Sequence, residues 1–136
     1  MMENRRNFVM KIAAGMAATG FMSVSGKANA SEPLLKNIFV HHVFFWLKEP
    51  GNSEARTQFE KGLQALITVP QIRSSHIGAP VESPREVVDD SFTYSYMAFF
   101  ESKEDQVIYQ THPIHLKFIE DCQHLWEKVI VYDAMD

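Results

Sequence analysis

The sequence has little cysteine, no block of like charges and no low-complexity tract. Its one cysteine is Cys122. A single thiol cannot close a disulfide within the chain, so the fold must be held by its apolar core or by a partner subunit. Basic residues are outnumbered, with 13 Lys and Arg against 17 Asp and Glu and a net charge of −4 at pH 7. This acidic balance excludes a nucleic-acid binder that works by electrostatic attraction.

The first thirty residues have the pattern of an export signal. An uncharged stretch, Ile12 to Val24, lies between a basic start and the small residues of Ala28-Asn29-Ala30; the basic start consists of Arg5, Arg6 and Lys11. Because thirteen residues are too few to span a bilayer, we expect no stable membrane anchor. We predict a signal peptide over residues 1–30, cleavage near Ala30, and a periplasmic or secreted mature protein.

The export route and the mature domain follow from the same segment. Arg5-Arg6-Asn7-Phe8-Val9 resembles the twin-arginine pattern, while Asn4 and the placement of Lys11 depart from it, so Tat and Sec export both remain open. Removal of residues 1–30 changes the net charge from −4 to −7. The remaining domain, residues 31–136, buries roughly 60–70% of its unfolded surface, and dimerisation would add to that.

The segment from Ile38 to Lys48 predicts a strand that is buried on both faces. It is rich in β-branched and aromatic residues and shows no regular polar alternation. A period of two puts His41, Val43, Phe45 and Leu47 on one side and His42, Phe44, Trp46 and Lys48 on the other. We expect helices to cover the first side and a second copy of the chain to cover the other.

The rest of the chain alternates helix and strand patterns. We predict a helix after Pro50-Gly51-Asn52-Ser53, a strand over Ile72–Ile77, a loop over 79–90, a strand over Phe92–Phe100, a helix capped by Ser102 and a last strand over Val129–Tyr132. The resulting order, β-α-β-β-α-β, is the ferredoxin-like pattern. It is an α+β fold in which helices cover one face of an antiparallel sheet.

The second helical region is interrupted by Pro113. The proline ring disfavours helical dihedral angles at His112, so one helix should end there and another should begin at Pro113 and run to about Trp126. Helical spacing then places His115 on the apolar face with Phe118, Ile119, Cys122 and Trp126. A titratable ring that points into the core of a small domain is a candidate functional group.

Several short motifs, in order, resemble the stress-responsive α/β-barrel (Dabb) domain family. They are the strand His41-His42-Val43-Phe44-Phe45-Trp46-Leu47-Lys48, Val69-Pro70, Phe100-Glu101-Ser102, Tyr109 followed by His112-Pro113-Ile114-His115, and Asp133. The resemblance covers roughly Phe39 to Asp133. It implies a homodimer whose sheets pack face to face as a barrel, which is the cover expected above for Phe44 and Trp46.

The resemblance also implies an activity. Family members of the olivetolic acid cyclase type close a linear polyketide by an aldol reaction that needs no metal or cofactor. Their catalytic histidine and tyrosine match His115 and Tyr109, and a histidine of their first strand matches His41. Their further pocket histidine is replaced here by Tyr94. We therefore expect His115 and Tyr109 to be catalytic, and no metal or cofactor to be needed.

Two functions fit these patterns. In the first, an exported enzyme acts on a hydrophobic carbonyl compound as a cyclase or isomerase, with His115 as general base and His41, Tyr94, Phe59, Val43 and Phe45 lining a small apolar pocket. In the second, the domain is a non-catalytic stress-responsive envelope protein that binds a small molecule or is simply stable, and its histidines are paired core residues. Fold analogy adds a cofactor-free monooxygenase as a related alternative. His112 is expected to cap a helix, and Cys122 to be a buried small hydrophobe.

Overall fold

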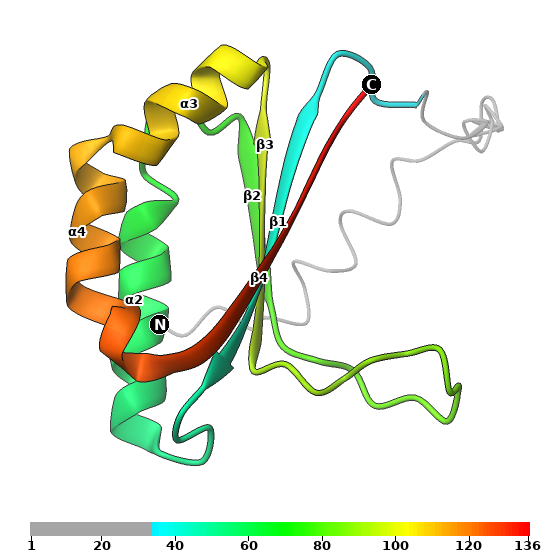
Figure 1. Cartoon of the computed structure of the whole chain (residues 1–136), viewed down its shortest axis with the longest axis vertical. Coiled ribbons are helices and arrows are strands. Elements are labelled where there is room, and N and C mark those ends of the chain that lie inside the picture. The colour runs from blue at the N-terminus through cyan, green and yellow to red at the C-terminus, as the bar shows by residue number, and fades with distance from the viewer. Residues whose placement is uncertain (1–33) are drawn as a thin grey trace, which may run out of the picture. The chain divides into compact units, whose positions relative to one another are not determined.

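The structure is a computed structural model that describes residues 34–136 (Figure 1). Its elements are β1 (Phe39–Leu47), α2 (Ser53–Leu66), β2 (Ser74–Gly78), β3 (Tyr94–Phe100), α3 (Lys103–Thr111), α4 (Pro113–Cys122), the 3₁₀ helix η1 (Gln123–Leu125) and β4 (Trp126–Met135). The four strands form one antiparallel sheet in the order β2-β3-β1-β4, and α2, α3 and α4 cover one of its faces. The predicted α+β, ferredoxin-like architecture is confirmed.

The first strand has the two-sided character that its sequence predicts. Residues of β1 alternate between buried and half-buried along its whole length. His41, Val43, Phe45 and Leu47 are buried on the helix side, whereas His42, Phe44 and Trp46 are half-buried on the other side. The strand lies between β3 and β4, so both of its edges are paired. Its inward side chains therefore sit at the centre of the domain.

Capping side chains fix where the helices begin. The Asn52 side chain accepts a hydrogen bond from the backbone N–H of Ala55 (3.1 Å), and Ser102 accepts one from Asp105 (3.1 Å). His112 has extended backbone angles (φ −64°, ψ 139°), as expected for a residue before proline. It ends α3 and caps α4, which confirms the predicted helix joint.

The element boundaries differ from the predicted ones at the ends of strands and of α4. The helix predicted to reach Trp126 ends at Cys122, and Trp126 is instead the first residue of β4. That strand is longer than predicted because it pairs with β1 along almost the full length of both strands. The alternation expected from Phe92 starts only at Tyr94. Phe92 packs against Phe44 on the sheet face that the helices leave uncovered (ring centroids 5.0 Å apart).

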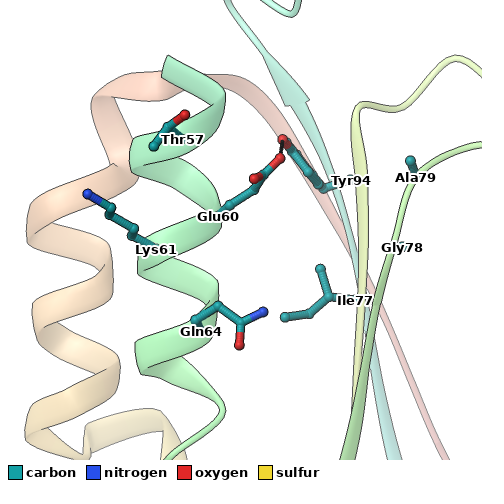
Figure 2. A pocket seen from close by; sticks show the side chains of 8 residues that line it. All are labelled: Thr57, Glu60, Lys61, Gln64, Ile77, Gly78, Ala79 and Tyr94. Carbon is teal, nitrogen blue, oxygen red and sulfur yellow. Dashed lines mark hydrogen bonds between the residues drawn. The ribbon is translucent and has the colours of Figure 1, made fainter. Parts of the chain in front are cut away.

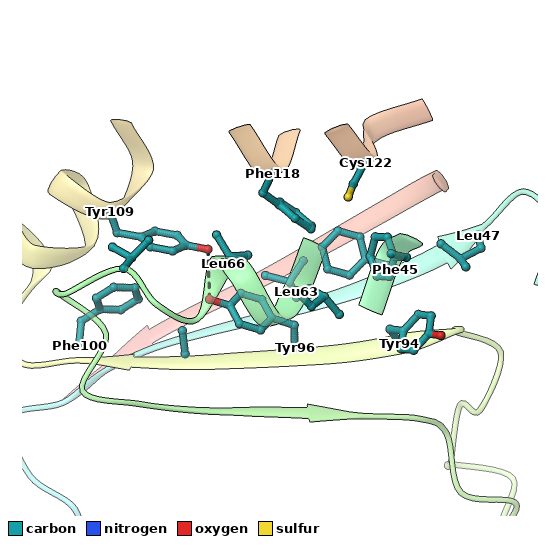
Figure 3. Close-up of a cluster of buried hydrophobic side chains, with 14 of the residues drawn as sticks. Phe45, Leu47, Leu63, Leu66, Tyr94, Tyr96, Phe100, Tyr109, Phe118 and Cys122 are labelled. Carbon is teal, nitrogen blue, oxygen red and sulfur yellow. Dashed lines mark hydrogen bonds between the residues drawn. The ribbon is translucent and has the colours of Figure 1, made fainter. Parts of the chain in front are cut away.

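The core fills the space between the sheet and the helices (Figure 3). Its fully buried large side chains are Tyr96, Tyr109, Phe59, Phe100, Leu63, Leu66, Val69 and Cys122. Helices α2 and α4 approach closely where Gly62 of α2 faces Cys122 and Phe118 of α4. The predicted burial of Cys122 is confirmed.

The signal segment predicted over residues 1–30 lies outside the residues that the structure describes. Between Leu34 and Asp136, no helix has the length and hydropathy needed to cross a membrane.

Candidate functional site

A cavity of 210 Å³ lies between the inward face of β1 and β4 and the helices α3 and α4. Its walls are mostly aliphatic and aromatic, and its polar side chains are His41, Tyr96, Tyr109, Gln110 and His115. The volume equals that of roughly seven water molecules in the liquid, and drug-sized ligands need about 300 Å³ or more. The cavity therefore suits a compact organic molecule.

Among the polar side chains of this cavity, His115 has a buried ring nitrogen without a hydrogen-bond partner in the described part of the chain. It comes from the first turn of α4, where the apolar spacing turns it inward, and it is 8% exposed. Its Nδ1 atom is buried and has no hydrogen-bond partner among the described residues. Burial lowers the pKa of His115, the nearby backbone of Gln110 opposes that shift, and the nearby His41 lowers the pKa further. The ring is thus held neutral near pH 7, with one nitrogen able to accept a proton.

Tyr109 lies beside His115 and is paired with a second phenol. The Tyr109 and His115 ring centroids are 4.7 Å apart, and the Tyr109 hydroxyl lies 3.2 Å from the hydroxyl of Tyr96 (Figure 3). Both tyrosines are 1% exposed. Burial raises the pKa of Tyr96 to about 12 and raises that of Tyr109 as well. Both phenols therefore keep their protons at neutral pH.

His41 is oriented by a carboxylate on the neighbouring strand. Its Nδ1 lies 2.6 Å from Oδ1 of Asp133, directly opposite it in the pairing of β1 with β4. His41 is buried, while the Asp133 side chain is 42% exposed. Because an ionised carboxylate can only accept, Nδ1 carries a hydrogen, and Nε2 is left as the ring nitrogen that is free to exchange a proton. The sequence analysis names Asp133 only as part of the family resemblance. Its contact with His41 could not be predicted there, because it depends on the register between β1 and β4.

The structure brings most of the predicted site residues together but places two elsewhere. His41, Val43, Phe45, Tyr109 and His115 all line the cavity. Phe59 and Tyr94 do not: Phe59 packs in the core against Phe45 and Tyr94 (ring centroids 4.9 and 5.1 Å apart).

Tyr94 belongs to a different surface feature. Its hydroxyl donates to the Glu60 carboxylate (2.5 Å), and it lines an open groove between α2 and strands β2 and β3 (Figure 2). Arg56 lies over the Tyr94 ring, 5.0 Å from its centroid. Burial raises the pKa of Tyr94 to about 12, so the Glu60 carboxylate accepts from a neutral phenol. Its polar tip therefore serves a surface contact and does not reach His115.

The phenol that lines the cavity from β3 is Tyr96, which the sequence interpretation did not select. The alternation of β3 placed Tyr94 and Tyr96 on the same face, and only strand register decides between them. Tyr96 pairs with Val43, the inward residue next to His41, whereas Tyr94 pairs with Phe45, further along the strand. Tyr96 therefore reaches the histidine end of the core and Tyr94 does not.

His112 and Cys122 have structural surroundings. Nδ1 of His112 accepts from the backbone N–H of Ile114 (3.1 Å), as expected of a helix cap. Burial raises the pKa of the Cys122 thiol, so it does not form a reactive thiolate. Among residues 34–136, no group of three or more His, Cys, Asp or Glu is arranged to hold a metal ion.

Comparison with known proteins gives a family and a set of fold neighbours. The family model for the stress responsive A/B barrel domain (Dabb) matches residues 39–136. A Dabb family protein with a ferredoxin-like fold from Mesorhizobium loti is 18% identical, with a TM-score of 0.61 over 73% of this chain and 96% of that one. No curated protein matches the chain.

Two further solved structures share the fold. A hydroxynitrile lyase from Passiflora edulis is 23% identical, with a TM-score of 0.63 over 73% of this chain and 93% of that chain. A dimeric ferredoxin-like protein of unknown function from Thermobifida fusca is 14% identical, with a TM-score of 0.61 over 79% of this chain and 100% of that one. At these identities the likeness concerns the fold.

Proposed function

The chain belongs to the stress-responsive α/β-barrel (Dabb) family, and we propose that its cavity between sheet and helices binds a compact hydrophobic carbonyl compound and converts it by proton abstraction. The reaction class is that of a cofactor-independent cyclase or isomerase. The observation that carries this proposal is the buried, unpartnered Nδ1 of His115 beside the Tyr109 phenol. A buried polar atom without a partner costs free energy, and a ligand that supplies the partner would recover it.

The chemistry follows from the protonation states of these groups. The neutral His115 ring takes a proton from the carbon next to the ligand's carbonyl group, and the electron pair of the broken C–H bond moves onto the carbonyl oxygen. Tyr109 keeps its proton at neutral pH and donates a hydrogen bond to that oxygen as charge develops there. In this proposal His41, which Asp133 orients through Nδ1, accepts or returns a proton through Nε2.

Deuterium exchange tests the proposal without knowledge of the natural substrate. Acetophenone is a compact aromatic ketone, and a general base in the cavity should exchange its methyl protons in D₂O, which NMR follows directly. We expect the wild-type protein to accelerate this exchange and His115→Ala to lose about 10²- to 10⁴-fold of the acceleration. His124→Ala, which removes an exposed histidine, is the matched control. The proposal would be refuted if the wild-type protein did not accelerate the exchange over the protein-free rate, or if His115→Ala accelerated it as much as the wild type does.

A non-catalytic binding or structural role is the second candidate, and a specific observation favours it. Several polar tips of the cavity already have protein partners, as in a satisfied core cluster: His41 with Asp133 and Tyr96 with Tyr109. In that case His115→Ala changes the free energy of unfolding and no reaction rate. Urea unfolding of the same variant therefore separates the two functions.

We also propose that the uncovered sheet face is the interface of a homodimer. Half-buried apolar side chains lie on it, namely Phe44, Trp46, Phe92, Met97, Phe99 and Ile130. Four of them, Phe44, Trp46, Phe92 and Ile130, line a hollow of 170 Å³. Lys128 also lines it and lies over the Trp46 ring, 4.4 Å from its centroid. The dimeric fold neighbour from Thermobifida fusca supports a second copy as the occupant.

Sedimentation equilibrium at micromolar concentration tests the dimer. We expect the wild type to sediment as a dimer and Phe44→Glu to sediment as a monomer, because a charge on this face cannot be buried unpaired. Leu116→Glu is the control, since Leu116 is 55% exposed on helix α4. A monomeric wild type would contradict the proposal.

Export remains a further proposal, supported by the sequence of residues 1–30 alone. If the chain is cleaved near Ala30, the N-terminal sequence of the mature protein begins near Ser31, and its measured mass is that of the chain from that residue on. Replacement of Arg5 and Arg6 by lysine blocks export only if the twin-arginine route is used. Recovery of the uncleaved chain from the cytoplasm would contradict export by either route.

A further inference from the structure

The two phenols of the cavity have different surroundings, although they share a hydrogen bond. The Tyr109 ring lies 4.7 Å from His115 and 5.7 Å from His41, measured between ring centroids. The Tyr96 ring meets His41 edge-on at 6.4 Å and lies on the strand side of the cavity. Of the two phenol rings, that of Tyr109 is therefore the one that packs against His115, and it is also the closer to His41.

A count of protons limits what the pair can do. Each phenol has one hydrogen to donate and two lone pairs that accept. Both phenols are protonated at neutral pH, and the contact between their oxygens uses one of the two hydrogens. One hydrogen is thus left for a third group, and the arrangement decides which tyrosine offers it.

We infer that Tyr96 is a positioning residue for Tyr109: its hydroxyl donates to the Tyr109 oxygen, holds that hydroxyl at the cavity and leaves the Tyr109 hydrogen for the ligand's oxygen. The inference rests on the proposed function, since it names how the carbonyl group is recognised. A phenol that accepts one hydrogen bond becomes a better donor in the next, because the two bonds polarise each other. Replacement of Tyr96 should therefore weaken recognition at Tyr109 without removing the group that touches the ligand.

The test uses acetophenone labelled with ¹³C at the carbonyl and three conservative variants. Tyr109→Phe removes the donor, Tyr96→Phe removes its support, and Tyr94→Phe removes a buried phenol of the same strand that lies outside the cavity. The infrared carbonyl stretch of the bound probe reports the hydrogen bond, and titration gives the Kd. A ligand-free measurement follows the ¹³Cζ resonance of Tyr109 by NMR.

We expect the carbonyl stretch to lie at its lowest frequency in the wild type and in Tyr94→Phe, to rise fully in Tyr109→Phe and to rise in part in Tyr96→Phe. The Kd should weaken about three- to tenfold in Tyr96→Phe, as for one neutral hydrogen bond, and stay within about twofold in the control. The Tyr109 resonance should move in Tyr96→Phe and not in Tyr94→Phe.

An unshifted carbonyl stretch in Tyr96→Phe, or an unmoved Tyr109 resonance, would overturn the inference. Failure of acetophenone to bind the wild type counts against the proposed carbonyl site itself, and the ligand-free spectra then decide whether Tyr96 positions Tyr109. The two failures are therefore distinguishable.

Discussion

A methyl group added at Gly62 should destabilise the domain, and removal of the cysteine sulfur opposite should restore it. A Cβ atom added at Gly62 would lie much less than 3.0 Å from Cys122 Sγ, and Cβ atoms in proteins essentially never make contacts shorter than 3.0 Å. The same atom would lie 3.2 Å from the Phe118 ring. Both neighbours are buried in α4, so neither can move into solvent. The clash therefore has to be relieved by a shift of one helix against the other.

The magnitude follows from two opposing contributions. Alanine is favoured over glycine within a helix by about 1 kcal/mol, whereas an extra methyl in a packed core costs about 1–3 kcal/mol. Gly62→Ala should thus lower the free energy of unfolding by up to about 2 kcal/mol, or about 4–8 °C in Tm for each kcal/mol in a domain of this size. Cys122→Ala alone should cost roughly 1 kcal/mol, as for a small buried apolar group.

The double variant supplies the decisive comparison. With the sulfur gone, the methyl group added at position 62 occupies the vacated volume. The double variant should therefore lose less unfolding free energy than the two single variants lose together, by about 0.5–3 kcal/mol. Urea unfolding of the full chain, followed by tryptophan fluorescence, gives all four free energies. Additivity within about 0.5 kcal/mol would refute the close α2/α4 contact.

Three smaller perturbations test other contacts. Burial lowers the pKa values of His115 and His42 in the folded domain. Below pH 6.5 or so, about the pKa of a histidine in the unfolded chain, the unfolded state therefore binds more protons than the folded state. Tm should fall as the pH drops below that value, and His115→Phe should make Tm depend less on pH. Ser102→Ala removes a helix cap and should cost about 1 kcal/mol in urea unfolding, and an unchanged midpoint would refute the cap. Asp133→Ala leaves the buried Nδ1 of His41 without its carboxylate and should cost about 1–3 kcal/mol; Asp133→Asn, which keeps an acceptor, should cost less.

Local patterns were sufficient to predict the fold. The apolar run from Ile38, the capping residues Asn52 and Ser102, and the break at Pro113 each act over a few residues, so the strand, the helices and the helix joint were predictable. The inward position of His115 follows from helical spacing alone, and its burial confirms it.

The rest of the candidate site depends on register, which local patterns do not contain. Tyr94 and Tyr96 have the same alternation, and only the pairing of Tyr96 with Val43 brings it to the cavity. The contact of His41 with Asp133 likewise requires a pairing between residues 92 positions apart. Trp126 was assigned to a helix because its spacing matches the apolar face, but pairing with β1 draws it into β4.

The position of β1 between β3 and β4 also affects the order in which the sheet can form during synthesis on the ribosome. β4 (Trp126–Met135) is synthesised after the other three strands of the sheet, and until it emerges the aromatic strand β1 has an open edge along which another nascent chain could add. The same late strand contributes Val129 and Val131 to the cavity wall and Asp133 to His41. The candidate site is therefore completed only when the two ends of the domain meet, and a chain truncated before Val129 lacks these three residues of it.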